Sequence, residues 1–204
     1  MKRGSEHIIS SVYAKKLEND RGVFSSFPLA EYMNIPFPNN SHTKKEIIFL
    51  NSLPTKENIK FILSADSAVK YFEKELNKIG LNINIKDDEK LKGLLKNIAP
   101  FIIILKHHYN RPRPNEISPI QYVWLKSAQS PSYPSGHSTQ SRFISLYLAN
   151  KYPMHKNKIM QIGENVGVSR LMARIHYPSD HIIGKKLANH LFAHYQKYTP
   201  FKNQ

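Results

Sequence analysis

The spacing of the apolar residues is the strongest constraint on the fold, because they recur three and four positions apart along most of the chain after residue 40. Such spacing places side chains on one face of an α-helix. The clearest stripe, in which Pro100 predicts a bend, consists of Leu91, Leu94, Leu95, Ile98, Ile102 and Leu105. We find no segment with the alternating pattern of a half-buried strand. A chain of 204 residues is also of single-domain size. The sequence therefore predicts an all-α, single-domain helical bundle.

The N-terminal part is mixed in pattern. A short helix over 5–17 fits the sequence, and the proline-containing stretch 27–40 predicts an irregular connection. A short helix should then begin near Ile47. We therefore expect an irregular and partly helical extension over 1–40 and a helical domain over 41–204.

A long helix is expected from Thr55, which can cap its start, to Gly80, which can end it. Its buried face would consist of Phe61, Ala65, Ala68, Val69, Phe72, Leu76 and Ile79. Residues 109–135 are rich in proline and serine and predict an ordered loop. Long loops inside compact domains are usually functional.

Three helices should follow this loop. The first covers about 136–152 and the second about 156–175, where Gly163 and Gly167 would allow a close helix contact. Ser179 can cap the last helix. Buried positions of the first and last of these helices would be Phe143, Ile144, Tyr147, Leu148, Ile183, Leu187, Leu191 and Tyr195.

Positive charge is concentrated in the C-terminal half. The formal net charge is +15; residues 1–89 hold 13 basic and 12 acidic residues, whereas residues 90–204 hold 17 and 3. A field of this sign attracts anions. It fits an anionic substrate, general solubility or loose binding to nucleic acid. No recognised nucleic-acid module appears, so we expect no obligatory nucleic-acid partner.

Several classes are excluded by what the chain lacks. It has no cysteine, which rules out disulfides, a thiolate nucleophile and cysteine metal sites. Its longest apolar run, 98–105, is about eight residues, whereas a membrane span needs about 20. No apolar segment follows the basic start, so we expect no signal peptide. These features favour a soluble, cytoplasmic protein, with a periplasmic location open if a leader has been removed.

Three basic side chains have a spacing that suits a phosphate group. Catalysis of phosphoryl transfer depends mainly on positioning and electrostatic stabilisation. Lys106 would supply a point charge, and Arg113 and Arg170 would supply planar guanidinium groups that hold two oxygens each. Any one of them alone is more often a solvated surface group, so the hypothesis depends on all three together.

The tetrapeptide Pro134-Ser135-Gly136-His137 precedes an apolar helix. The unpaired N–H groups at a helix start form an anion site. Gly136 would let an oxygen approach its N–H closely, and Ser135 would add a hydroxyl donor. An ordinary helix cap is the alternative interpretation.

His176 and Asp180 are four positions apart at the expected junction of two helices. A carboxylate on one ring nitrogen fixes the tautomer and leaves the other nitrogen as a nucleophile. A histidine–aspartate pair of this kind is also common as a purely structural feature. The histidines of this half form no tight metal signature with carboxylates, so we expect no metal site; they are His107, His108, His181, His190 and His194.

Taken together, the motifs Lys-x6-Arg-Pro (106–114), Pro-Ser-Gly-His (134–137) and Ser-Arg-x5-His-x3-Asp (169–180) resemble those of the type 2 phosphatidic acid phosphatase (PAP2) superfamily. This superfamily includes bacterial class A non-specific acid phosphatases, lipid phosphate phosphatases and vanadium-dependent haloperoxidases. The resemblance covers residues 106–180, and it implies an α-helical bundle that transfers phosphoryl groups without a metal.

The resemblance also implies a role for each motif residue. His176 would attack phosphorus and become a phosphohistidine, and Asp180 would orient it. His137 would protonate the leaving oxygen and then activate water. The phosphoryl oxygens would be held by Lys106, Arg113, Ser135, Gly136 and Arg170. Because His176 must be neutral while His137 must be protonated, we expect a mildly acidic to neutral optimum.

Three functions stay open. A chain of this size without membrane spans is most similar to class A acid phosphatases, which points to a small phosphate ester as substrate and to no cofactor. A haloperoxidase would use the same site for vanadate, which could otherwise act as an inhibitor. A basic protein that binds anions or nucleic acid without turnover is the third. The sequence specifies neither the substrate nor the oligomeric state, although residues that flank the motifs could stack on a base or sugar or simply pack: Tyr109, Asn110, Trp124, Tyr133 and Tyr177.

Overall fold

The computed structural model describes residues 21–35 and 38–199, and all the regular structure in these two ranges is helical. The all-α prediction is therefore confirmed. Along the chain the elements are η1 (Gly22–Phe24), α2 (Ala30–Met33), α3 (Asn40–Ser52), α4 (Ile59–Ser64), α5 (Ala68–Asn77), η2 (Ile85–Asp87), α6 (Glu89–Tyr109), α7 (Pro114–Ile117), α8 (Gly136–Lys151), η3 (Pro153–His155), α9 (Lys156–Met172) and α10 (Pro178–Tyr198).

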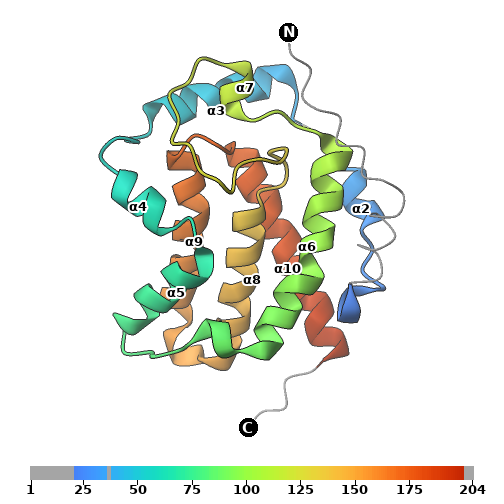
Figure 1. Cartoon of the computed structure of the whole chain (residues 1–204). Helices are drawn as coiled ribbons and strands as arrows, with labels where there is room; N and C mark the ends of the chain where they lie inside the picture. Colours follow the sequence, from blue (N-terminus) through green and yellow to red (C-terminus); the bar gives the residue numbers. More distant parts are fainter. Residues whose placement is uncertain (1–20, 36–37, 200–204) are drawn as a thin grey trace.

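Helix α8 runs through the middle of the bundle and contacts α9, α10 and α6 (Figure 1). Its predicted apolar face is buried in the core, together with that of α10. The predicted face of α6 is buried as well, and Pro100 lies inside this helix. No helix in the described part of the chain combines the length and the apolar character that crossing a membrane would require.

Two glycines of α9 bring this helix close to its neighbours. A Cβ atom on Gly163 would lie 2.0 Å from Ser145 Oγ on α8. A Cβ atom on Gly167 would lie 2.3 Å from the His181 ring on α10. Since real side chains cannot approach so closely, both glycines are needed for the observed helix spacing. The predicted close contact is confirmed.

The single long helix predicted between Thr55 and Gly80 is wrong. Two helices, α4 and α5, occupy this stretch, with a break at residues 65–67. Thr55 does not cap α4, whose N-cap is Asn58; the Thr55 hydroxyl donates a 2.7 Å hydrogen bond to the carbonyl of Met172, the last residue of α9. The break falls at Asp66 and Ser67, which are poorer helix formers than alanine or leucine, and the Asp66 side chain bonds there to Arg170 and Ser127. It places Asp66 at the candidate site.

The sequence suggested Ser179 as the cap of the last helix, and this prediction is wrong for α10. Its first residue is Pro178, its N-cap is Tyr177, and the Asp180 carboxylate accepts a 2.9 Å hydrogen bond from the Tyr177 N–H. Helix α9 ends at Met172, three residues before the predicted end.

The N-terminal predictions need smaller corrections. Helix α2 lies inside the stretch expected to be irregular, and α3 begins at Asn40, well before Ile47. Asn39 explains this early start, because its side chain accepts a hydrogen bond from the His42 N–H. The predicted helix over 5–17 lies outside the described residues, and the boundary at residue 40 stays a prediction.

One end of the bundle is covered by other segments. Helices α3 and α7 and the loop that follows α7 lie across the end where α8 and α10 begin and α6 and α9 finish (Figure 1). The three sequence motifs all lie at this covered end.

Candidate active site

The turn between α9 and α10 holds a histidine–carboxylate pair. His176 Nδ1 lies 3.1 Å from Asp180 Oδ2, and both side chains are almost completely buried. On the other side of the ring, Arg113 Nη1 lies 3.4 Å from His176 Nε2. A guanidinium can only donate, so Nε2 is the acceptor and Nδ1 carries the hydrogen that Asp180 accepts. The pair thus leaves a lone pair on Nε2 facing the basic side chains.

The Asp180 carboxylate is bound by Arg111, a residue that the sequence analysis did not include. Arg111 Nη1 lies 2.7 Å from Asp180 Oδ1, and Arg111 Nη2 lies 2.8 Å from Glu46 Oε2 on α3. All three side chains are buried, and the Arg111 guanidinium stacks 3.7 Å above the Tyr177 ring. The sequence Arg-Pro-Arg-Pro carried a signal for Arg111. Proline favours extended backbone in the residue before it, and residues two apart in an extended segment face the same side, so Arg111 should face the same side as Arg113.

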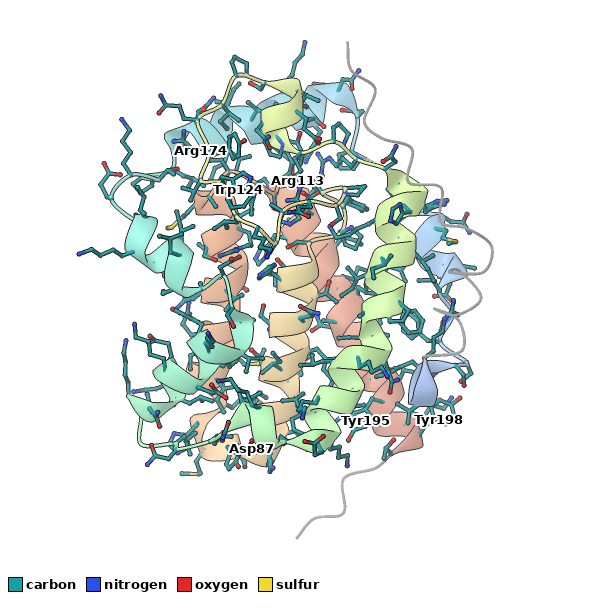
Figure 2. All side chains as sticks on the ribbon, viewed as in Figure 1. Asp87, Arg113, Trp124, Arg174, Tyr195 and Tyr198 are labelled. Atoms are coloured by element: carbon teal, nitrogen blue, oxygen red, sulfur yellow. The ribbon has the colours of Figure 1, made fainter. Side chains whose placement is uncertain are left out.

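Two of the predicted phosphate ligands come from the end of α6 and the start of α7. Arg113, whose side chain lies at the covered end in Figure 2, donates through Nε to the carbonyl of Ser130 at 2.9 Å and through Nη1 to that of Ile175 at 2.7 Å. Lys106 Nζ donates to the carbonyls of Pro131 and Ser132. Both basic groups are buried, and the carbonyl groups fix them in place without supplying a negative counter-charge.

The third basic side chain, Arg170, is held by the break between α4 and α5. Its Nη1 lies 2.7 Å from Asp66 Oδ1, and its Nη2 donates to the carbonyl of Ile62 at 2.9 Å. Ser127 donates to the same Asp66 oxygen at 2.7 Å. The Asp66 backbone carbonyl accepts a 2.9 Å hydrogen bond from His137 Nε2. Asp66 therefore orders two motif residues at once, and the sequence analysis did not include it.

Ser135 and Gly136 form the start of α8, as predicted. Ser135 is the N-cap, its hydroxyl accepts a hydrogen bond from the Ser138 N–H, and its own N–H donates to the Asp180 carbonyl at 3.0 Å. The peptide bond that precedes Pro134 is cis. A Cβ on Gly136 would meet Ile102 at 3.6 Å and Lys106 Cε at 4.0 Å. These are ordinary contacts, so packing within the protein does not itself require glycine here.

The basic groups and burial together shift the titration of the site. Burial lowers the pKa of His176 well below its usual value, and the charges of Arg113 and Lys106 act in the same direction. Burial, followed by the charge of Arg170, lowers the pKa of His137 to about 4. Burial lowers the pKa of Lys106 to about 7. Both histidines are therefore neutral at neutral pH.

Asp180 shifts the opposite way for the same reason. Burial raises the pKa of its carboxyl group, because the charged form is the one that loses water. The Arg111 charge and the Tyr177 N–H act against this rise. Burial also lowers the pKa of Arg113 to about 10, which still leaves it charged in the neutral range.

The structure brings the eight predicted site residues to one end of the bundle. His176 is electrostatically coupled to Lys106, Arg113, His137 and Arg170. Of the flanking aromatic side chains, Tyr133 and Tyr177 are buried beside Arg111, and Tyr109 bonds to backbone carbonyls of the α2 region. They serve packing, whereas Trp124, in the loop that follows α7, is 67% exposed (Figure 2).

Comparison with known proteins gives a consistent picture. An acid phosphatase of Zymomonas mobilis is 31% identical over 109 residues, which are 50% of this chain and 41% of the relative. Non-specific acid phosphatases of Salmonella typhimurium and Salmonella typhi are each 27% identical over 135 residues, which are 61% of this chain and 53% of the relative. The chain thus spans about half the length of the curated relatives it matches. The family model of the PAP2 superfamily matches residues 93–202, more than half of the sequence and all three motifs, and the chain belongs to this superfamily.

Proposed function

We propose that the protein hydrolyses phosphate monoesters through a covalent intermediate on His176. The observation that carries this proposal is the hydrogen-bonding state of His176, whose Nδ1–H faces Asp180 while its Nε2 lone pair faces the Arg113 guanidinium. Buried basic groups that keep the histidine neutral also attract the anion it would attack. The similarity to acid phosphatases supports the same reaction.

In the first step, Nε2 of His176 forms a bond to phosphorus as the bond from phosphorus to the ester oxygen breaks. The ring becomes positively charged, and Asp180, 3.1 Å from Nδ1, stabilises that charge. The charge that spreads over the phosphoryl oxygens would be balanced by Lys106, Arg113 and Arg170. These fixed cations could supply the stabilisation that a metal ion supplies elsewhere, so we propose that the reaction needs no metal.

His137 would give a proton to the leaving oxygen and take one from water in the second step. A backbone carbonyl only accepts, so the hydrogen on Nε2 points to Asp66, and Nδ1 remains for proton exchange with the substrate. Its pKa is about 4 in the free enzyme. A bound phosphate dianion favours the protonated ring and raises that pKa. Because kcat/KM reports the free enzyme, in which the pKa of His137 is about 4, we expect kcat/KM to be highest at acidic pH, below the mildly acidic to neutral range inferred from the sequence.

The direct test is hydrolysis of p-nitrophenyl phosphate between pH 4 and 7.5 with excess chelator. Wild type should turn over, and His176→Ala should lose kcat by at least about a thousandfold, as expected when a nucleophile is removed. His155→Ala, which changes a histidine remote from the motifs, is the matched control. When the reaction with substrate labelled in the phosphoryl group is quenched in alkali, the label should remain on wild-type protein and not on His176→Ala, because phosphohistidine survives base.

Each alternative outcome has a distinct meaning. Turnover that persists in His176→Ala would overturn the covalent mechanism, and turnover abolished by the chelator would overturn the metal-free one. Absence of turnover combined with vanadate-dependent oxidation of bromide would favour a haloperoxidase. Absence of both, with tight phosphate binding, would favour an anion-binding protein.

A further inference from the structure

A series of hydrogen bonds leads from Ser135, one of the predicted phosphate-binding residues, to the protein surface. It passes through residues to which the sequence analysis assigned no role in phosphate binding. The hydroxyls of Ser135 and Ser138 lie 2.9 Å apart, and Ser138 Oγ lies 2.8 Å from His181 Nδ1. His181 Nε2 in turn lies 3.0 Å from Glu164 Oε1, and Lys185 Nζ lies 2.9 Å from the same oxygen. The first three residues are buried, whereas Glu164 is 34% exposed.

Close packing of α8, α9 and α10 fixes this series of hydrogen bonds in place. His181 on α10 fits against Gly167 on α9, where a Cβ would lie 2.3 Å from the ring. Gly184, also on α10, lies where a Cβ would be 2.8 Å from the Ser135 carbonyl and 3.2 Å from Ser138 Cβ. The ring of His181 therefore has little freedom to turn away from Ser138.

The direction of each hydrogen bond follows from the two ends. The Glu164 carboxylate only accepts, so His181 Nε2 carries a hydrogen. When His181 is neutral, Nδ1 accepts the single hydrogen of Ser138, so the hydrogen bond from Ser138 to Ser135 is lost unless Ser135 donates instead. When His181 is protonated, Nδ1 donates to Ser138, and Ser138 donates to Ser135. Only in this second state can Ser135 keep its hydrogen bond with Ser138 and also donate its hydrogen to an oxygen of the substrate.

We propose that His181 is a positioning residue that, through Ser138, releases the Ser135 hydroxyl to donate to the phosphoryl group when the His181 ring takes up a proton. This inference rests on the proposed function, because it assigns the same site an additional support. It predicts that binding of a tetrahedral dianion is coupled to protonation of His181, with the proton taken from solvent.

The charged groups around His181 set the pH at which this occurs. Burial lowers the pKa of His181, as does the charge of Lys185 on its own helix, whereas Glu164 on α9 raises it. Arg142 on α8 interacts electrostatically with Glu164. The balance puts the protonation step below the usual histidine range, in the acidic range where we expect the enzyme to work.

Sulfate is the best probe, because it is a tetrahedral dianion whose own charge is constant over the range of interest. Its Kd should be measured by calorimetry from pH 4.5 to 8 for wild type and His181→Leu. Both proteins share the contributions of His137 and Lys106 to the pH dependence. Wild type should show an additional gain in affinity at acidic pH of about three- to tenfold, the value of one hydrogen bond, and His181→Leu should lack it.

A double-mutant cycle separates positioning from a general structural effect. In a Ser135→Ala background, His181→Leu should cause no further change in the pH dependence, because the hydroxyl on which it acts is absent. Glu164→Gln, a change at a half-exposed site, should move the additional step to lower pH, and it serves as the test if His181→Leu does not fold. His190→Asn, on the same helix, should behave as wild type.

Equal pH dependence in wild type and His181→Leu, or an equal effect of His181→Leu with and without Ser135, would overturn the proposal. Both results are independent of turnover. A protein that binds sulfate with the expected linkage and hydrolyses no ester would refute the proposed function and leave the role of His181 in anion binding intact.

Discussion

Arg111 Nη1 lies 2.7 Å from Asp180 Oδ1 inside the protein, and the other end of the guanidinium contacts Glu46. Without such a partner, the buried Asp180 carboxyl group would favour its protonated form. The contact therefore connects α3, which lies outside the matched motifs, to the residue that orients His176.

We predict that Arg111→Met lowers both stability and activity. Removing one partner of a buried ion pair leaves uncompensated charge and costs about 3–5 kcal/mol, which urea unfolding would measure. Asp180 would then hold a proton more readily and stabilise the charged His176 ring less, so kcat should fall more than KM rises. Arg142→Met, at an exposed hydrogen bond to Asn189, should change stability by less than about 1 kcal/mol. A stable, fully active Arg111→Met would contradict this role.

The contrast between Arg111 and Arg113 shows how far the sequence predicts this site. Arg113, Lys106 and His176 could be found because their spacing, together with the resemblance to a family, assigns each a role. Glu46 and Asp66 carry no such signal, and for Arg111 the Arg-Pro-Arg-Pro pattern indicates only that it faces the same side as Arg113. The partners of these residues lie 65 to 104 positions away. Such pairings depend on which helix ends meet, and one sequence does not specify this.

The fold shows the same division. Long apolar stripes predicted α6, α8 and α10, because burial of one helix face is encoded locally. The break between α4 and α5 was missed because the stripe continues across it, while the Asp66 side chain gains an ion pair with Arg170. The competing signal was local and weak, since Asp66 and Ser67 are only moderately poor helix formers.

Asp66→Asn should test the second supporting contact. The backbone carbonyl that binds His137 remains, but Arg170 loses its carboxylate partner, and a charged hydrogen bond contributes about 1.5–3 kcal/mol. We expect kcat/KM to fall roughly ten- to hundredfold. The Asp66 charge also raises the pKa of His137, so the basic limb of the kcat/KM profile should move to lower pH.

Asp87→Asn is the control for this change, since Asp87 lies at the opposite end of the bundle from Arg113 (Figure 2). It should leave both the rate and the pH profile unchanged. An unaltered profile in Asp66→Asn would show that Arg170 and His137 are held by other contacts.

The titration of His137 predicts lower stability in acid. Its pKa is about 4 in the folded protein and near 6.5 in an unfolded chain, so between these values only the unfolded state binds the proton. The contribution is complete above about pH 6.5 and is lost as pH falls toward 4. From pH 8 to pH 5 the loss should be roughly 2 kcal/mol. Urea unfolding of wild type and His137→Asn at both pH values isolates it, and an equal pH dependence of the two would refute the shift.

Two glycines in helix interiors should respond oppositely to alanine. A Cβ on Gly163 would lie 2.0 Å from Ser145 Oγ and 2.9 Å from the Ser141 carbonyl, whereas a Cβ on Gly93 would meet nothing within 4 Å. Gly163→Ala should destabilise the protein by about 1–3 kcal/mol or more, because α8 and α9 must separate. Gly93→Ala should stabilise it by about 0.5–1 kcal/mol, because alanine restricts the unfolded chain and favours helix. Thermal and urea unfolding would compare them. If both variants shifted stability in the same direction, the close α8–α9 packing described above would be wrong, and with it the placement of Ser138 against α9 and α10.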